Sequence, residues 1–197
     1  MKKLILTLAT IISSAAAFGI NPQYQKFLGL KYRYPCENFE KGKFQSITGK
    51  FNGKTTDTIT LFPYDGEWDG DEFLYDEWIL ISKNGTVPSK IISSYYPDLV
   101  YEGDLDGNGT DEFGVLHTGM MGCWNYYSSF TVYHGKIEPF ISVDWYTCDD
   151  VNPSIALKST GTKGKVAVKY YNDNDVVHGS GRIRQHSTTK TITKFLK

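Results

Sequence analysis

Residues 98–119 read DLVYEGDLDGNGTDEFGVLHTG, and this stretch predicts two β-strands joined by an acidic loop. Apolar and polar residues alternate at 98–105 and again at 111–119, which is typical of strands. The segment between them gathers Asp, Asn and Gly, which favour tight turns. A strand, a short loop and a second strand indicate an antiparallel hairpin.

The same pattern occupies most of the chain. The further alternating runs are 43–51, 57–64, 72–83, 89–96, 124–135, 137–145, 165–172 and 188–196. The 14 Tyr, 11 Phe and 4 Trp also favour strands. Asn21 followed by Pro22 predicts the start of a short helix over 22–30. We therefore predict an all-β fold of antiparallel hairpins or blade-like sheets, either a partial propeller or a sandwich, preceded by one short helix.

Two segments resemble each other at a spacing of 54 residues. The segment near 49–62 (GKFNGKTTDTITL at its start) matches the segment near 103–116 (GDLDGNGTDEFGV at its start). A further shift by 54 reaches Gly161, where the match is poor. A period near 50 residues is typical of propeller blades or related arrays of small sheets.

The loop at 104–112 carries the acceptors of a calcium site at every second position. Counting Asp104 as the first position, the predicted ligands are Asp104, Asp106, Asn108, the Thr110 carbonyl and Glu112. Gly109 stands where such a loop must bend sharply. The twelfth position is Val115, so the pattern is not that of an EF-hand. The alternative is a polar turn without an ion.

This strand–loop–strand pattern resembles the FG-GAP/VCBS repeat, which occurs in integrin-like propellers and in many exported bacterial proteins. The resemblance covers Tyr101 to Leu116 and is faint around 49–62. It implies a calcium loop between two strands. In the earlier copy the corresponding positions are Lys50, Asn52, Lys54 and Thr58. That set cannot hold a cation, so we expect only one copy to bind.

A second acidic cluster lies at 65–77, in the segment DGEWDGDEFLYDE. Asp65, Glu67 and Asp69 have the same odd spacing, which leaves open a second cation. A solvated acidic loop is the alternative. Carboxylates between aromatic residues also suit glycan binding, and a pair of them could hydrolyse a glycan. The cluster offers many carboxylates and no feature that selects two.

The N-terminus predicts export. Lys2 and Lys3 precede an apolar run, and small residues end at Ala17, so we expect a signal peptide at 1–17 and a single domain at 18–197. No later stretch is apolar enough to span a membrane. We expect a secreted or periplasmic protein. Of Cys36, Cys123 and Cys148, the last two are the expected disulfide pair, although the sequence leaves the pairing open.

The charge distribution and the absence of known catalytic motifs limit the classes of function that the sequence allows. Residues 18–157 carry 10 Lys and Arg against 20 Asp and Glu, whereas 158–197 carry 9 against 2. The acidic body disfavours nucleic acid. No zinc-protease or G-x-S-x-G motif is present. We expect a Ca²⁺-stabilised binding module for an unknown protein or glycan ligand. One alternative is a secreted hydrolase that uses carboxylates of the 65–77 cluster, and another is a purely structural component of the envelope.

Overall fold

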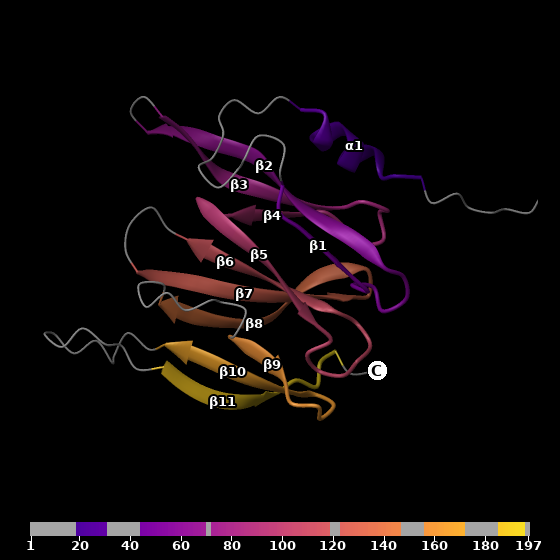
Figure 1. Ribbon diagram of the computed structural model, residues 1–197, viewed down its shortest axis with the longest axis vertical. Helices are drawn as coiled ribbons and strands as arrows, with labels where there is room; N and C mark the ends of the chain where they lie inside the picture. Colours follow the sequence, from indigo (N-terminus) through magenta and orange to yellow (C-terminus); the bar gives the residue numbers. More distant parts are fainter. Residues whose placement is uncertain are drawn as a thin grey trace, which may run out of the picture.

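Three antiparallel sheets follow one another along the chain and are stacked along the long axis of the molecule (Figure 1). The computed structural model describes residues 19–30, 44–69, 72–118, 123–146, 156–171 and 185–195, with side chains omitted at 67–69 and 72–74. The first sheet has the order β1-β2-β3-β4, the second β5-β6-β7-β8 and the third β11-β10-β9. Each four-stranded sheet is therefore a meander of consecutive strands. The predicted all-β fold is confirmed.

The elements have the following bounds. The short helix is α1 (Pro22–Leu28), and the first sheet contains β1 (Ser46–Gly49), β2 (Asp57–Asp69), β3 (Glu72–Ser82) and β4 (Lys90–Ser93). The second sheet contains β5 (Tyr96–Gly103), β6 (Glu112–Thr118), β7 (Trp124–Tyr133) and β8 (Lys136–Tyr146). The third contains β9 (Leu157–Ser159), β10 (Lys165–Tyr171) and β11 (Gln185–Thr191).

The helix covers the outer face of the first sheet. The Asn21 side chain accepts a hydrogen bond from the Gln23 amide at 3.0 Å, which is an N-cap, and Pro22 takes the first helical position. Tyr24 and Phe27 are the buried residues of α1. They form a cluster with Phe62, Ile79 and Ile81. The predicted helix over 22–30 is confirmed, and it ends two residues earlier than predicted.

Two apolar layers hold the three sheets together. Leu61, Leu80, Val115 and Phe130 belong to a buried cluster shared by the first two sheets. Leu116, Trp145, Val166 and Val168 belong to a second cluster shared by the second and third sheets. The second sheet is thus buried on both faces. This explains why Glu112 to Leu116 of β6 are all buried instead of alternating between buried and exposed positions.

Most strand boundaries differ from the prediction by a few residues, and three differences have a clear structural reason. β2 continues past Pro63 to Asp69, because a register shift at Pro63 and Asp65 accommodates the proline after β1 has stopped pairing. β9 was missed, since three residues carry no readable alternation. β11 ends at Thr191 and not near 196, because Phe195 follows the strand and packs against Tyr133 and Phe140.

Some predictions fall on parts of the chain that lie outside the described residues. These are the signal peptide at 1–17, Cys36 and Cys148, so the disulfide pairing of Cys123 stays a prediction. Within the described ranges, no helix is long and apolar enough to cross a membrane.

Candidate metal centre

The acidic loop joins β5 to β6 and coils around the Asp104 carboxylate. Its Oδ1 accepts hydrogen bonds from the amides of Gly107 at 2.8 Å and Asn108 at 3.0 Å, and its Oδ2 accepts from Gly109 at 2.9 Å. Gly107 and Gly109 have φ of 73° and 88°, a region that side chains rarely adopt. The bend predicted at Gly109 is therefore present. The loop geometry turns the carboxylate toward the interior of the coil.

Asp106 is buried in the loop with one oxygen unsatisfied. Its side chain is fully buried, and Oδ1 accepts a hydrogen bond from the Asn108 amide at 3.1 Å. Its Oδ2 has no hydrogen-bond partner among the described residues. Burial raises the pKa of this carboxyl, and the neighbouring Asp104 charge acts in the same direction. A buried carboxylate oxygen without a donor is costly unless something else neutralises it.

Glu112 opens β6 and is also fully buried. Its Oε2 accepts a hydrogen bond from the Leu105 amide at 2.8 Å, and its Oε1 accepts one from the Thr131 hydroxyl at 2.8 Å. Burial raises the pKa of Glu112 to about 8, and the charges of Asp106 and Asp104 add to this effect. The two hydrogen bonds hold the side chain in one orientation, although they do not offset the cost of burying its charge.

Asp104, Asp106 and Glu112 each offer one carboxylate oxygen, and these atoms lie within 4.8 Å of one another. Two oxygens that each bind one Ca²⁺ at about 2.4 Å can be at most about 4.8 Å apart, so the spacing is compatible with a shared ion. The three residues therefore form an acidic triad that could hold a metal ion, with Asp106 and Glu112 buried and Asp104 on the exposed side. In the part of the chain that the structure describes, no other group of three His, Cys, Asp or Glu residues meets this criterion.

The other two predicted ligands, Asn108 and Thr110, lie in the same loop. The Asn108 Oδ1 accepts a hydrogen bond from the Thr110 amide at 2.7 Å, which closes a short turn. Thr110 is buried, and its hydroxyl lies next to Gly53 of the first sheet. The structure brings the three carboxylates together, whereas coordination by Asn108 and Thr110 stays a prediction.

The loop is wedged between the corresponding loops of the two neighbouring sheets, on the right in Figure 1. On one side, the Asp111 carboxylate accepts a hydrogen bond from the Lys50 amide at 2.7 Å. On the other, the Gly164 amide donates to the Asp106 carbonyl at 2.6 Å. A Cβ atom on Gly107 would lie 3.5 Å from the Lys163 Cα atom. The acidic loop thus contacts both the first and the third sheet.

The equivalent loops are built without carboxylate clusters. In the first sheet, the Asn52 Oδ1 accepts hydrogen bonds from the backbone amides of Lys54 and Thr55, both at 2.9 Å, so a side-chain amide takes the place of a carboxylate in this turn. Gly53, Gly107 and Gly161 have φ of 69°, 73° and 71°. Glycines with the same positive φ therefore recur at a spacing of 54 residues, while the blade-like repeat itself stays a prediction.

The 65–77 cluster is only partly described. The Asp65 carboxylate accepts a hydrogen bond from the Gly66 amide at 2.8 Å, and Asp65 faces Glu77 across the β2–β3 pair. The side chains of residues 67–74 lie outside the described set, so a second cation there stays a prediction.

Sequence reasoning missed the residues that fix the triad, Thr131 and the Leu105 amide. Thr131 is buried on β7 and reaches Glu112 across the sheet. In the sequence, the one sign of this role is that the hydroxyl residue Thr131 stands within an apolar run. His117 lies at the opposite end of β6 from Glu112, about 17 Å along the strand, and so is not part of the site. Its ring contacts Ser93 instead.

Comparison with known proteins adds no relative. No family model matches the chain. No curated protein and no solved structure matches it either.

Proposed function

We propose that the protein is an exported β-sheet binding module stabilised by one structural Ca²⁺ ion in the 104–112 loop. Asp104, Asp106 and Glu112 are the proposed carboxylate ligands, and Asn108 and the Thr110 carbonyl complete the set. The observation that carries the proposal is the Asp106 Oδ2 atom, which is buried without a hydrogen-bond partner beside two other carboxylates. A divalent cation at this point offsets both the burial of the charges and their mutual repulsion.

The donor set favours calcium over other metals. The three acidic ligands supply oxygen only, whereas structural zinc sites and copper sites are built mainly from His and Cys. Magnesium demands a near-ideal octahedron and usually keeps several waters. A coiled loop with carboxylates, an amide and a carbonyl matches the flexible oxygen shell of Ca²⁺. The resemblance of residues 101–116 to the FG-GAP/VCBS pattern supports the same ion.

A structural role follows from the position of the loop. Asp106 is bonded through its carbonyl to Gly164 of the third sheet, and Asp111 is bonded to Lys50 of the first. An ion that orders the loop therefore also orders its contacts with both neighbouring sheets. Extracellular calcium modules bind with Kd of about 10⁻⁴–10⁻³ M, and we expect the same range here.

A binding role is favoured over hydrolysis. Of the 65–77 carboxylates whose side chains are described, Asp76 alone lines a cleft of about 870 Å³ between the first and second sheets. Paired carboxylates on opposite sides of a scissile bond would be needed for glycoside hydrolysis. The signal-like segment at 1–17 supports export to a compartment where millimolar calcium is available.

Thermal unfolding with calcium and with chelator tests the proposal. At a concentration about 100 times Kd, binding to the native state adds about 2.7 kcal/mol, which raises Tm by about 5–10 °C for a domain of this size. Asp106→Asn should abolish the shift. Asp98→Asn is the matched control, because it removes one charge from an exposed position on β5. Equal melting temperatures with and without calcium in the unsubstituted protein would reject the ion.

A further inference from the structure

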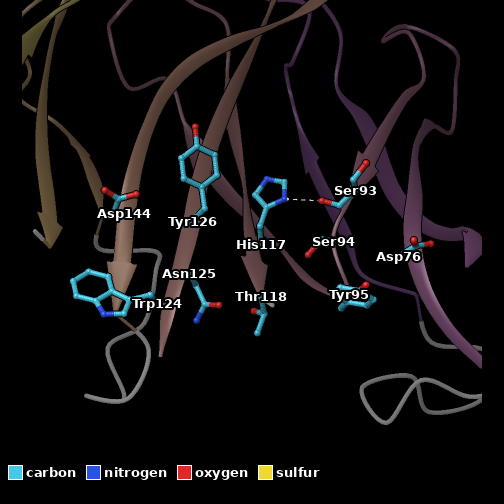
Figure 2. Close-up of a pocket in the computed structure, with 10 residues that line it drawn as sticks. All are labelled: Asp76, Ser93, Ser94, Tyr95, His117, Thr118, Trp124, Asn125, Tyr126 and Asp144. Atoms are coloured by element: carbon cyan, nitrogen blue, oxygen red, sulfur yellow. Dashed lines mark hydrogen bonds between the residues drawn. The ribbon is translucent and has the colours of Figure 1, made fainter. Parts of the chain in front are cut away.

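A cleft of about 870 Å³ lies between the first and second sheets, away from the acidic triad. Its walls come from β3 and β4 on one side and from β6, β7 and β8 on the other (Figure 2). This volume lies within the range of about 300–1,000 Å³ typical of small-molecule sites.

The cleft begins at the edge of the apolar core between the two sheets, where polar side chains replace apolar ones. Phe113 and Val115 of β6 face the first sheet and belong to the apolar cluster. His117 continues the same face of this strand, since side chains alternate with a period of two. His117 pairs with Tyr126 of β7, and Tyr126 pairs with Asp144 of β8. A row of polar side chains thus crosses three strands on a face that is otherwise used for apolar packing.

Two buried polar atoms in the cleft have no hydrogen-bond partner among the described residues. Ser94 is 9% exposed, and its Oγ is the first of these atoms. The His117 Nδ1 lies 3.2 Å from the Ser93 carbonyl oxygen, so Nδ1 carries the hydrogen and donates it. The His117 Nε2 is buried and also lacks a partner, and in this tautomer it is an acceptor. Burial lowers the pKa of His117, which keeps the ring neutral. A ligand that donates hydrogen bonds would satisfy the His117 Nε2 acceptor, and the Ser94 hydroxyl can accept a hydrogen bond from the same ligand.

Aromatic side chains flank these polar atoms. Trp124 is 36% exposed and Tyr126 is 44% exposed, although both line the cleft. The Trp124 ring is anchored edge-on to Tyr146, with centroids 5.3 Å apart. Figure 2 shows Trp124 and Tyr126 on one wall and Tyr95 on the other. Rigid aromatic surface with polar neighbours is suited to ligands that have both apolar faces and polar edges.

The charges of the cleft exclude anions. Asp76 and Asp144 lie at opposite ends of the group in Figure 2, and none of the described lining residues is Lys or Arg. Because hydrogen-bond acceptors are spread along the cleft, a suitable ligand has hydrogen-bond donors spread along its length. A single amine or quaternary ammonium has one cationic centre, whereas a saccharide chain has many hydroxyl groups.

We propose that the cleft between the first and second sheets binds a neutral oligosaccharide, with Trp124 and Tyr126 stacking on sugar rings. Asp76, Asp144, Ser94 and the His117 Nε2 atom accept hydrogen bonds from its hydroxyl groups. This inference rests on the proposed binding role and specifies its ligand class. It does not depend on the cation.

Isothermal titration with the neutral hexasaccharides cellohexaose, hexa-N-acetylchitohexaose and mannohexaose tests the proposal, at saturating calcium and again in chelator. We expect saturable binding of at least one hexasaccharide. Trp124→Ala and Asp144→Asn should each weaken it about tenfold or more. Tyr64→Ala is the matched control, because Tyr64 is an exposed aromatic residue that packs on Phe27 outside the cleft. Its affinity should equal that of the unsubstituted protein.

Absence of saturable binding to all three sugars would overturn the inference, as would binding that survives both Trp124→Ala and Asp144→Asn. Saturable binding of spermidine in place of the sugars would assign the cleft to cations and also overturn it. None of these outcomes affects the calcium-dependent melting temperature. Failure of the sugar site is therefore distinguishable from failure of the metal site.

Discussion

The Tyr127 hydroxyl on β7 donates a hydrogen bond to the Glu102 carboxylate on β5, across the intervening strand β6. The tyrosine ring is fully buried, and it crosses β6 at Gly114. Burial raises the pKa of Glu102 to about 7, while the hydrogen bond from Tyr127 opposes this rise. The glycine of the acidic hairpin thus makes room for a contact between two strands that are not neighbours.

Gly114→Ala should therefore destabilise the protein. The added Cβ atom would collide with the ring and hydroxyl of Tyr127, and strand β6 has no free face to shift into. We expect a loss of about 1–3 kcal/mol in urea denaturation. Gly19→Ala is the control, since its Cβ atom would meet nothing within 4 Å. Equal stability of the two variants would show that Tyr127 does not occupy this position.

Glu112→Gln should separate the cost of the buried charge from the benefit of the ion. In chelator, the variant should be at least as stable as the unsubstituted protein, because it keeps the side-chain volume and removes a buried charge. Adding calcium should not raise the melting temperature of this variant. Glu138→Gln is the control, since Glu138 forms an exposed ion pair with Lys194. A Glu112→Gln variant that still melts higher with calcium would remove Glu112 from the site.

Calcium should slow amide exchange in the third sheet as well as in its own loop. The Gly164 amide donates to the Asp106 carbonyl, so its opening requires the acidic loop to move. We expect stronger protection of this amide in hydrogen-exchange NMR when calcium is added. The Gly29 amide, which closes α1 on the outer face of the first sheet, should not change. Protection confined to residues 104–112 would contradict the coupling of sheets.

Asp57 should make the protein sensitive to acid. Its carboxylate accepts hydrogen bonds from the Ser82 hydroxyl, from the Thr86 hydroxyl at 2.6 Å, and from the amides of Asn84 at 3.0 Å and Thr58 at 2.7 Å. Burial alone would raise the pKa of Asp57, but these hydrogen bonds outweigh it and lower the pKa below its usual 3.8.

A lowered pKa in the folded state means that the carboxylate stabilises the protein above about pH 3.8 and that this stability is lost as the pH falls further. Urea denaturation between pH 2.5 and pH 7 should show Asp57→Asn less stable by about 2 kcal/mol at neutral pH, where charged hydrogen bonds are lost. The difference should shrink in acid. A difference that is independent of pH would show that the charge of Asp57 does not stabilise the fold.

The hairpins and the acidic loop could be predicted because both depend on local chemistry. Alternation marks the strands, and the turn at His134-Gly135 has the positive φ that such hairpins require. The odd spacing of Asp104, Asp106 and Glu112 brings them together, since they share one loop and its flanking strand. The contacts that the sequence did not predict join residues far apart in the chain. The partner of Glu112 is Thr131, which only the pairing of strands brings near.

The cleft was missed for the same reason. His117, Tyr126 and Asp144 lie on three strands, and their common row depends on register. The bulge opposite Ser129 places an extra residue in β8, so counting along β8 from Ile137 places Asp144 on the wrong face. One signal was readable: His117 occupies the face of β6 that Phe113 and Val115 use for the core.

Crystallography with anomalous scattering tests the central claim most directly. Crystals grown with calcium and measured at a long wavelength should show one strong anomalous peak within about 2.3–2.6 Å of carboxylate oxygens from Asp104, Asp106 and Glu112. A clear map of this loop with no anomalous peak between the three carboxylates, at calcium concentrations above 10 millimolar or about 10 times the expected Kd, would contradict the account.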